Sequence, residues 1–257
     1  MRLPGALSAL SALRGLLAEL REDEGKPLVV GGAHELARVL ERELARDGDA
    51  SAVRVGDPSG AAVYVHICAP RRGSLDDVAL KRARKARVPV IAVGDTDDVL
   101  ATDVVPLPPG RPLPVEEIVA CIAAKLGEDG APLAGRLPVL RDAVCERIVE
   151  SFARKNGIVA AAVFIPGVDL PVLARNQVRM LLRLDQAFGR ELRPLPEGVA
   201  VLAAGLGLRT VARELLDLVP VAGWAVKGGV AYAGTRALGH AAVLRLQSAQ
   251  DTNKGPS

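Results

Sequence analysis

Between residues 26 and 127, short apolar runs alternate with segments of helical periodicity, and this alternation limits the folds that the chain can adopt. The runs at residues 28–30, 53–55 and 61–67 are predicted strands, and HELARVLERELAR after the first of them is a predicted helix. Next come helical DDVALKRARKARV, strand-like PVIAVG, a short strand in VVPLP and helical PVEEIVACIAAKLG. The pattern predicts an α/β domain with a largely parallel sheet over residues 26–127.

A polar segment rich in glycine and proline at residues 128–138 follows this domain, and we predict that it is a linker. Beyond it, apolar residues recur at helical spacing, which predicts helices over residues 139–157, 170–189, 198–219 and 223–247. We therefore expect an all-α domain at residues 139–247 and a disordered tail at residues 248–257. A chain of 257 residues is long enough for two such domains, each with its own core.

The N-terminal segment, residues 1–25, has leucines at helical spacing: Leu7, Leu10, Leu13, Leu17 and Leu20. This stripe predicts an amphipathic helix. Arg14 interrupts the apolar run and no A-x-A-like site follows, which disfavours a signal peptide. The helix either packs on the domain behind it or lies on a membrane surface, and the few basic residues on its polar face favour packing.

The composition argues against nucleic-acid binding and against a protein with many membrane spans. The net charge is only +3, and aromatic residues make up 2% of the chain. There is thus little to stack on bases, and there is no aromatic belt for a bilayer, so we expect no nucleic-acid partner. The mean hydropathy of +0.23 is high for a soluble protein and directs attention to membrane lipid as a partner.

The three cysteines, Cys68, Cys121 and Cys145, are far apart in the sequence and odd in number. This pattern indicates buried thiols in a reducing compartment rather than a disulfide framework, so we expect the protein on the cytoplasmic side. His66 and Cys68 share one face of a predicted strand, but no second pair of ligands follows. We therefore expect no bound metal.

Two glycines, Gly31 and Gly32, stand between the first predicted strand and the first predicted helix, where many nucleotide-binding domains hold a phosphate. A GxxxxGK[ST] loop binds phosphate through backbone N–H groups and a lysine, and its hydroxyl residue binds Mg²⁺. If that pattern starts at Gly31, then Leu36, Ala37 and Arg38 replace the glycine, the lysine and the hydroxyl residue. The spacing of a G-x-G-x-x-G fingerprint is absent as well.

Later segments differ in the same way at the positions where a GTPase domain binds Mg²⁺ and guanine. After the third strand, PRRG has Pro70 in place of an aspartate, while Gly73 is kept. After PVIAV, GDTD has Gly94 and Asp95 in place of Asn and Lys, and Asp97 could still accept a hydrogen bond from a base. The order and spacing thus resemble a Rossmann-like or GTPase-like domain without the residues for metal and triphosphate.

Two interpretations of the glycine pair remain. It forms either a tight turn that binds nothing or a degenerate nucleotide site made of Gly31, Gly32 and Asp97. The missing lysine and metal ligands supply much of the catalysis in phosphoryl-transfer enzymes, so we expect no enzyme, no catalytic residue and no cofactor. His34 follows the glycines, but no nucleophile motif accompanies it and we assign it no role.

A cluster of basic residues lies at and before the third predicted helix: Arg71, Arg72, Lys81, Arg82, Arg84, Lys85 and Arg87. Such a cluster could bind acidic lipid or phosphate. The solvated face of a helix gives the same pattern, and we favour that interpretation. Asp76 and Asp77 fit the start of this helix better than a catalytic carboxylate pair.

The most specific pattern lies in the predicted helical domain, in FIPGVDLPVLARNQVRMLLRLDQAFG and ELLDLVPVAGWAVKGGVAYAGTRALGHAA. Its spaced elements are Pro166, Asp169, Gln177, Met180, Pro220, Gly223, Gly229, Thr235 and Gly239. On these positions, residues 140–245 resemble the YcjF-like, GTPase-associated domain of unknown function. The resemblance implies a GTPase as a partner or as the preceding domain, and a place at the inner membrane for some members.

Small side chains occupy every fourth position of the last predicted helix: Ala225, Gly229, Ala233, Ala237 and Ala241. We expect this face to let another helix approach closely, as small-residue faces do in lipid. Lys and Arg interrupt the apolar segments, so that none spans a bilayer well. The helices form either a soluble bundle or hairpins that insert shallowly at Pro166 and at residues 220–224.

We therefore expect a non-catalytic, membrane-associated adaptor that combines a pseudo-GTPase α/β domain with a helical GTPase-associated domain. It would lie in the cytoplasm or at the inner face of the cell membrane, with a GTPase or another protein as its partner. One alternative is a binder or enzyme of a nucleotide or phosphorylated small molecule at the loop after the first strand. Another alternative is a soluble protein-interaction module.

Overall fold

The structure is a computed structural model that describes residues 15, 18, 20, 25–68, 74–95, 103–162, 170–190 and 223–254. The chain divides into two compact units. The α/β unit consists of Asp23–Arg147 with Gln186–Gly189, and the helical unit consists of Met1–Glu22, Ile148–Asp185 and Arg190–Ser257. The predicted order of an α/β domain followed by a helical domain is confirmed.

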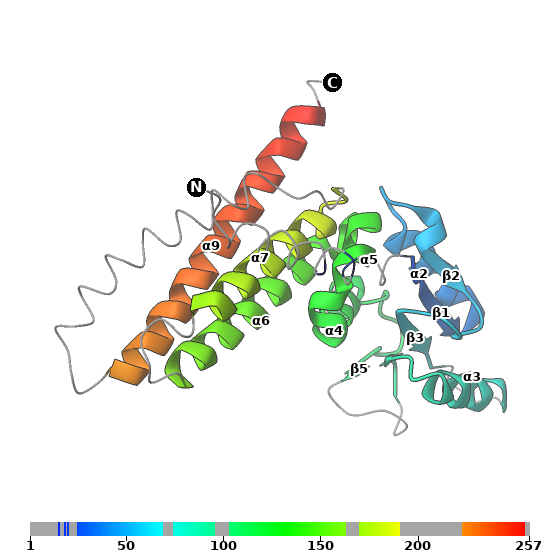
Figure 1. Ribbon diagram of the computed structural model, residues 1–257. Helices are drawn as coiled ribbons and strands as arrows, with labels where there is room; N and C mark the ends of the chain where they lie inside the picture. Colours follow the sequence, from blue (N-terminus) through cyan, green and yellow to red (C-terminus); the bar gives the residue numbers. More distant parts are fainter. Residues whose placement is uncertain are drawn as a thin grey trace. The chain divides into compact units, whose positions relative to one another are not determined.

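In the described residues of the α/β unit, one five-stranded parallel sheet has the order β2-β1-β3-β4-β5 (Figure 1). The strands are β1 (Leu28–Gly32), β2 (Val53–Val55), β3 (Val63–Ile67), β4 (Val90–Val93) and β5 (Val104–Val105). The central pairing aligns Val30 with Val65 and Val65 with Ile91. Valine and isoleucine dominate these strands because both faces of a parallel sheet are covered.

Helices cover both faces of the sheet. α2 (His34–Leu44) connects β1 to β2, and α3 (Ser74–Lys85) lies between β3 and β4. These connections run in opposite directions across the sheet, so right-handed crossovers place the two helices on opposite faces. Leu80 and Ala83 of α3 pack with Val29 and Tyr64 in one buried cluster. α4 (Val115–Leu126) follows β5 and packs on β4 and β5.

The predicted linker at residues 128–138 is wrong, because this segment is folded as part of the α/β unit. It contains η3 (Gly127–Gly130) and α5 (Ala131–Arg136), and η4 (Pro138–Leu140) follows. Leu133 and Leu137 are buried. Pro132 lies in the first turn of α5, where proline favours helix formation, so the proline that suggested a linker starts a helix instead.

The helical unit is built on α6 (Arg141–Ala162), α7 (Leu170–Ala187) and α9 (Gly223–Lys254). The predicted helix at residues 198–219 and most of the predicted helix at residues 1–25 lie outside the described residues. The disordered tail was predicted from residue 248, but α9 continues to Lys254. In this extension, Thr252 Oγ1 donates to the Ser248 carbonyl oxygen at 2.9 Å.

α6, α7 and α9 lie side by side (Figure 1). α9 runs antiparallel to α6, because Gly228 lies against Gly157 and Gly239 lies against Val149. Asn176 of α7 bonds to Asn156 of α6. Among the described helices, none combines the length and the apolar character needed to cross a bilayer.

Candidate functional site

The carboxyl edge of the sheet between β1 and β3 is the first place to search for a ligand site. In doubly wound sheets, ligands bind where successive connections leave the sheet in opposite directions. Here β1 leads to β2 on one side and β3 leads to β4 on the other. The predicted site residues Gly31 and Gly32 end β1 at this point, whereas Asp97 lies outside the described residues.

The turn after β1 is short and closed. In this fully described stretch, Ala33 alone joins β1 to α2, so the chain forms no loop that could surround a phosphate. The Ala33 N–H donates to the Ile67 carbonyl oxygen at 2.9 Å, which ties the turn to the end of β3. Gly32 has a φ of 90°, and a Cβ at this position would overlap that same oxygen. Only glycine therefore fits here.

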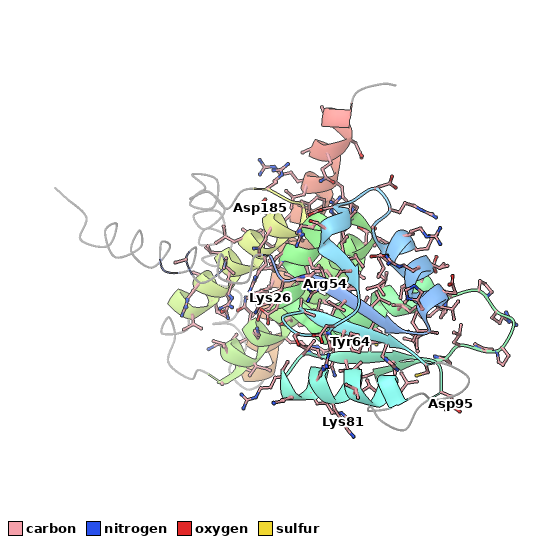
Figure 2. The ribbon with its side chains drawn as sticks, turned by 90° about the vertical axis from the view of Figure 1, so that its right-hand side faces the viewer. Lys26, Arg54, Tyr64, Lys81, Asp95 and Asp185 are labelled. Carbon is pink, nitrogen blue, oxygen red and sulfur yellow. The ribbon has the colours of Figure 1, made fainter. Side chains whose placement is uncertain are left out.

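Gly31 has a separate packing reason. A Cβ on Gly31 would overlap the hydroxyl group of Tyr64, which lies on the side of the sheet that faces α3 (Figure 2). Tyr64 and His66 are both buried, and the Tyr64 hydroxyl oxygen lies 3.2 Å from His66 Nδ1. The space beside Gly31 is thus filled by an aromatic side chain of the neighbouring strand. A degenerate nucleotide site at Gly31, Gly32 and Asp97 stays a prediction.

The start of α2 is not arranged to attract an anion. Ala33 is its N-cap residue and offers no side-chain hydrogen bond, and Glu35 lies in the first turn. A carboxylate at this end opposes the positive end of the helix dipole, which is what attracts phosphate to helix N-termini. Neighbouring His34 is exposed. In the part of the chain that the structure describes, no group of three or more His, Cys, Asp or Glu side chains is placed to hold a metal.

Asp57 organises the connection between β2 and β3. Its carboxylate accepts the Ser59 N–H at 2.8 Å and Arg82 Nη1 of α3 at 2.7 Å. Arg54 of β2 donates to the Ser59 carbonyl oxygen at 2.7 Å. Hydrogen bonds from Ser59, and then the one from Arg82, lower the pKa of Asp57 to about 2. Asp57 is therefore ionised at neutral pH and holds Arg82 against the connection.

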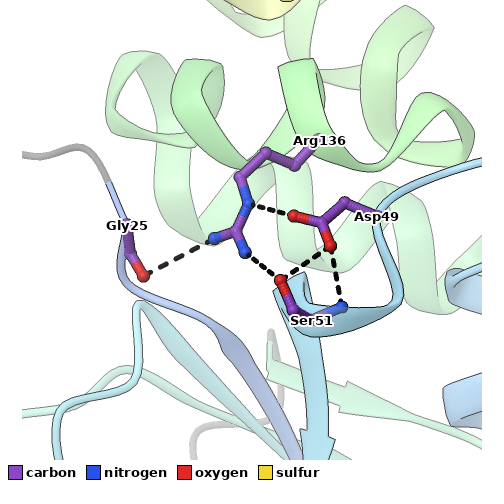
Figure 3. A network of polar contacts seen from close by, with 4 residues as sticks. All are labelled: Gly25, Asp49, Ser51 and Arg136. Atoms are coloured by element: carbon purple, nitrogen blue, oxygen red, sulfur yellow. Dashed lines mark hydrogen bonds and ion pairs between the residues drawn. The ribbon is translucent and has the colours of Figure 1, made fainter.

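Arg136 at the end of α5 joins segments that are far apart in the sequence (Figure 3). Its Nε donates to Asp49 Oδ2 and its Nη2 donates to Ser51 Oγ, both at 3.0 Å. Its Nη1 lies 3.5 Å from the carbonyl oxygen of Gly25. Asp49 also caps η1 (Ala50–Ala52) by accepting the Ser51 N–H at 2.9 Å. These contacts hold the segment at residues 128–138 on the α/β unit.

In the helical unit, buried amide and hydroxyl groups join α6, α7 and α9. Asn156 Nδ2 donates to Thr235 Oγ1 at 3.0 Å, and Asn176 Nδ2 donates to Asn156 Oδ1 at 2.8 Å. Asn156 is fully buried and Thr235 is 1% exposed. Because buried polar groups are costly without partners, this chain of hydrogen bonds fixes how the helices align.

The structure places the predicted signature residues of the helical domain in different environments. Thr235 belongs to the buried hydrogen-bonded chain, Met180 is fully buried and Gln177 of α7 is half-buried. A Cβ on Gly239 would lie 2.6 Å from Val149 Cγ2, so Gly239 is needed where α9 crosses α6. Gly229 is exposed. Gly223 begins α9, while Pro166, Asp169 and Pro220 lie outside the described residues.

The predicted small-residue face of α9 is wrong as a packing face within the chain. Its described members Gly229, Ala233, Ala237 and Ala241 are exposed. The residues that pack are Gly228, Thr235, Gly239 and Leu246, all of which are buried. A four-residue repeat advances by about 40° per step around a helix with 3.6 residues per turn, so it does not stay on one face.

Four exposed apolar side chains lie near one end of the described helices, where α6 ends and α7 and α9 begin. Ile158 is 69% exposed, Val172 48%, Val226 39% and Val230 47%. The charged side chains nearest to these residues along the described helices are the cations Arg154, Lys155, Arg175 and Lys227, of which Arg154 is paired with Glu150. We call Ile158, Val172, Val226 and Val230 the apolar end.

Sequence reasoning did not identify Asn156, Tyr64 or Arg136, whose importance depends on partners that are distant in the sequence. A polar residue such as Asn156 at a buried helical position is the signal that could have found the first of them. Compared with known proteins, the chain matches no family profile, no curated protein and no solved structure.

Proposed function

We propose that the protein is a non-catalytic adaptor that attaches to a membrane surface through the apolar end of its helical unit. The α/β unit then presents a surface to a partner protein, for which a GTPase is the candidate suggested by the resemblance of the helical residues. The observation that carries the proposal is the apolar end, with Lys155, Arg175 and Lys227 near it on the same helices. Four of the eight large apolar side chains that are exposed in the described residues belong to this end of the helical unit.

Both parts of this surface favour an anionic bilayer. Full burial of an aliphatic side chain gains roughly 1.5 to 3 kcal/mol, and each cation near an anionic surface adds about 1 kcal/mol. Lys155 and Lys227 lie within one helical turn of Ile158 and Val226 along the chain. Their long side chains can keep the ammonium groups at the lipid headgroups while the apolar residues enter the interface.

The closed carboxyl edge of the α/β unit supports the non-catalytic part of the proposal. Gly31 and Gly32 serve packing, Ala33 leaves no phosphate-binding loop, and Glu35 opposes an anion at the start of α2. An adaptor needs a stable surface rather than a reactive group, and the closed edge of the sheet provides a stable surface.

Flotation with vesicles tests the membrane contact. We expect the full chain to float with vesicles that contain phosphatidylglycerol and to bind pure phosphatidylcholine vesicles more weakly. Replacing Ile158→Glu and Val230→Glu together should lower the bound fraction by at least about tenfold, because two apolar contacts become charged ones. Both side chains are exposed, so the fold should persist.

The matched control replaces Val39→Glu and Leu244→Glu, which are exposed apolar residues elsewhere in the chain. This control has the same change of charge and should retain binding within about twofold. Equal loss in both double variants would show that net charge alone governs binding and would refute the apolar end. A full chain that stays unbound at low salt would support a soluble interaction module.

A second candidate function is binding of a phosphorylated small molecule at the carboxyl edge of the sheet. The change of direction between β1 and β3 favours it, because ligands bind at this position in sheets of this order. A nucleotide or sugar phosphate at saturating concentration should then raise the melting temperature. Retention of that shift in Ala33→Asp, which adds a second carboxylate at the start of α2, would argue against binding at this edge.

A further inference from the structure

The outer surface of α3 and the turn after it carry a concentration of positive charge that the apolar end does not use. Lys81, Arg82, Arg84, Lys85 and Arg87 are all exposed within seven consecutive positions. Lys81 lies on the side of α3 that faces away from the sheet (Figure 2). Arg82 is paired with Asp57, whereas no ion pair between described residues involves Lys81, Lys85 or Arg87.

Arg87 has a backbone conformation that favours glycine. Its φ is 55°, its N–H donates to the Arg84 carbonyl oxygen at 3.0 Å, and the Val88 N–H donates to the Ala83 carbonyl oxygen at 2.9 Å. Glycine is the usual residue at this position after a helix, because a Cβ is crowded there. The chain therefore keeps a cation where the fold favours glycine. Backbone strain of this kind points to a role for the side chain.

We propose that the basic end of α3, made of Lys81, Arg84, Lys85 and Arg87, binds an acidic surface of a partner protein. This inference rests on the proposed adaptor function for the presence of a partner, but its surface is separate from the apolar end. Arginine can bind a carboxylate through two parallel hydrogen bonds, which suits a folded acidic partner.

The two arginines in this cluster favour a protein partner over a membrane or a nucleic acid. The potential of an anionic bilayer is diffuse and would accept a cation at many positions, whereas carboxylates on a folded surface need cations at matching positions. In the described residues of α3 and of the turn that ends it, no aromatic side chain is available to stack on bases. The arrangement therefore fits an acidic protein surface best.

A fluorescent poly-glutamate peptide serves as the probe, with its binding to the full chain measured by anisotropy. Lys81→Glu with Lys85→Glu should weaken binding by at least about tenfold. The matched control, Arg42→Glu with Arg111→Glu, changes the net charge equally at exposed sites elsewhere in the α/β unit and should weaken binding less than about threefold. Carbodiimide coupling of the bound peptide should modify Lys81 and Lys85 before Lys26.

Arg87→Gly separates function from folding. It should weaken peptide binding by about threefold while raising the melting temperature by about 2 to 4 °C, because it removes the crowded Cβ. Equal weakening by the Lys81/Lys85 pair and by the Arg42/Arg111 pair, or coupling without preference for α3, would overturn the proposal. So would loss of phosphatidylglycerol binding by the Lys81/Lys85 pair with peptide binding intact, since the partner would then be lipid. Failure of the Ile158/Val230 variant to lose vesicle binding would refute the membrane contact alone.

Discussion

Glycine has different tasks in the two units of this molecule. In the α/β unit, Gly31 and Gly32 let the Tyr64 side chain and the Ile67 main chain close the carboxyl edge of the sheet. In the helical unit, Gly228 lets α9 approach α6, whereas the adjacent Gly229 has no heavy atom within 4 Å of a Cβ built on it. A glycine thus allows a neighbouring helix or strand to approach the backbone closely. Whether another part of the same chain does so depends on where that part lies.

The largest expected effect concerns the closed turn of the α/β unit. Gly32→Ala should lower the free energy of unfolding by about 4 kcal/mol or more, because its Cβ overlaps the Ile67 carbonyl oxygen. Gly60→Ala is the control, since Gly60 also has a positive φ, of 74°, but has nothing nearby. It should cost only about 1 kcal/mol, and equal urea midpoints for the two variants would contradict the comparison.

The reactivity of Cys145 measures how well the α/β unit excludes water. Burial raises the pKa of this thiol to about 12, so its thiolate fraction at pH 8 should be about 1000-fold lower than that of a thiol with the reference pKa. Iodoacetamide labelling followed by mass spectrometry should therefore modify Cys145 far more slowly than in the urea-unfolded chain. Between the reference pKa and the raised one, only the unfolded chain ionises this thiol, so stability falls as the pH rises. Similar labelling rates in the folded and the unfolded chain would show that the interior is open.

In the helical unit, loss of the buried chain of hydrogen bonds should destabilise the protein less than Gly32→Ala does. Asn156→Ala should lower the free energy of unfolding by about 2 to 3 kcal/mol, because it leaves the groups of Thr235 and Asn176 without their buried partner. Asn156→Asp keeps the shape but buries a charge, and its cost should fall as the pH is lowered. If both variants unfolded at the wild-type urea concentration, the hydrogen bonds would not hold the helices together.

The smallest effects test which side of α9 is packed. Gly239→Ala should destabilise by roughly 1 to 3 kcal/mol, because its Cβ would lie 2.6 Å from Val149 Cγ2. Gly229→Ala should instead stabilise by about 0.5 to 1 kcal/mol, as alanine does at an exposed helical position. Thermal melts of the two variants suffice. The structure requires Gly239→Ala to lower the melting temperature and Gly229→Ala to raise it. The reverse result would mean that the predicted small-residue face packs within the chain.

The sequence predicted the elements of the sheet well because each is locally encoded. The run before Gly31 is apolar and β-branched, and the helix after Ala33 has a clear apolar stripe at Ala37, Leu40 and Leu44. The linker prediction was wrong because proline and glycine are common both in linkers and at the start of helices, and Pro132 lies at the start of α5. Burial of Leu133 and Leu137, which decides between the two, is a tertiary property.

The candidate sites were harder to predict for the same reason. Gly31 and Gly32 suggested a phosphate loop, but their packing depends on Tyr64 and Ile67, more than thirty positions away in the sequence. The sequence does repeat small residues along α9. Which side of α9 packs, however, depends on where α6 crosses it. Long-range contacts of this kind leave no local periodic signal.

The contacts that α5 and the start of α6 make with residues 186–189 also determine when the first unit can finish folding during synthesis. The strands are complete at Val105, but a Cβ on Gly135 would overlap the carbonyl oxygen of Gln186, and Arg141 stacks over Phe188 with its guanidinium carbon 5.1 Å from the ring centre. The last residues of the N-terminal unit therefore leave the ribosome only after all of α7 has been translated. A nascent chain released before Phe188 would hold its sheet but lack this closing contact, so early termination should yield a protease-sensitive product.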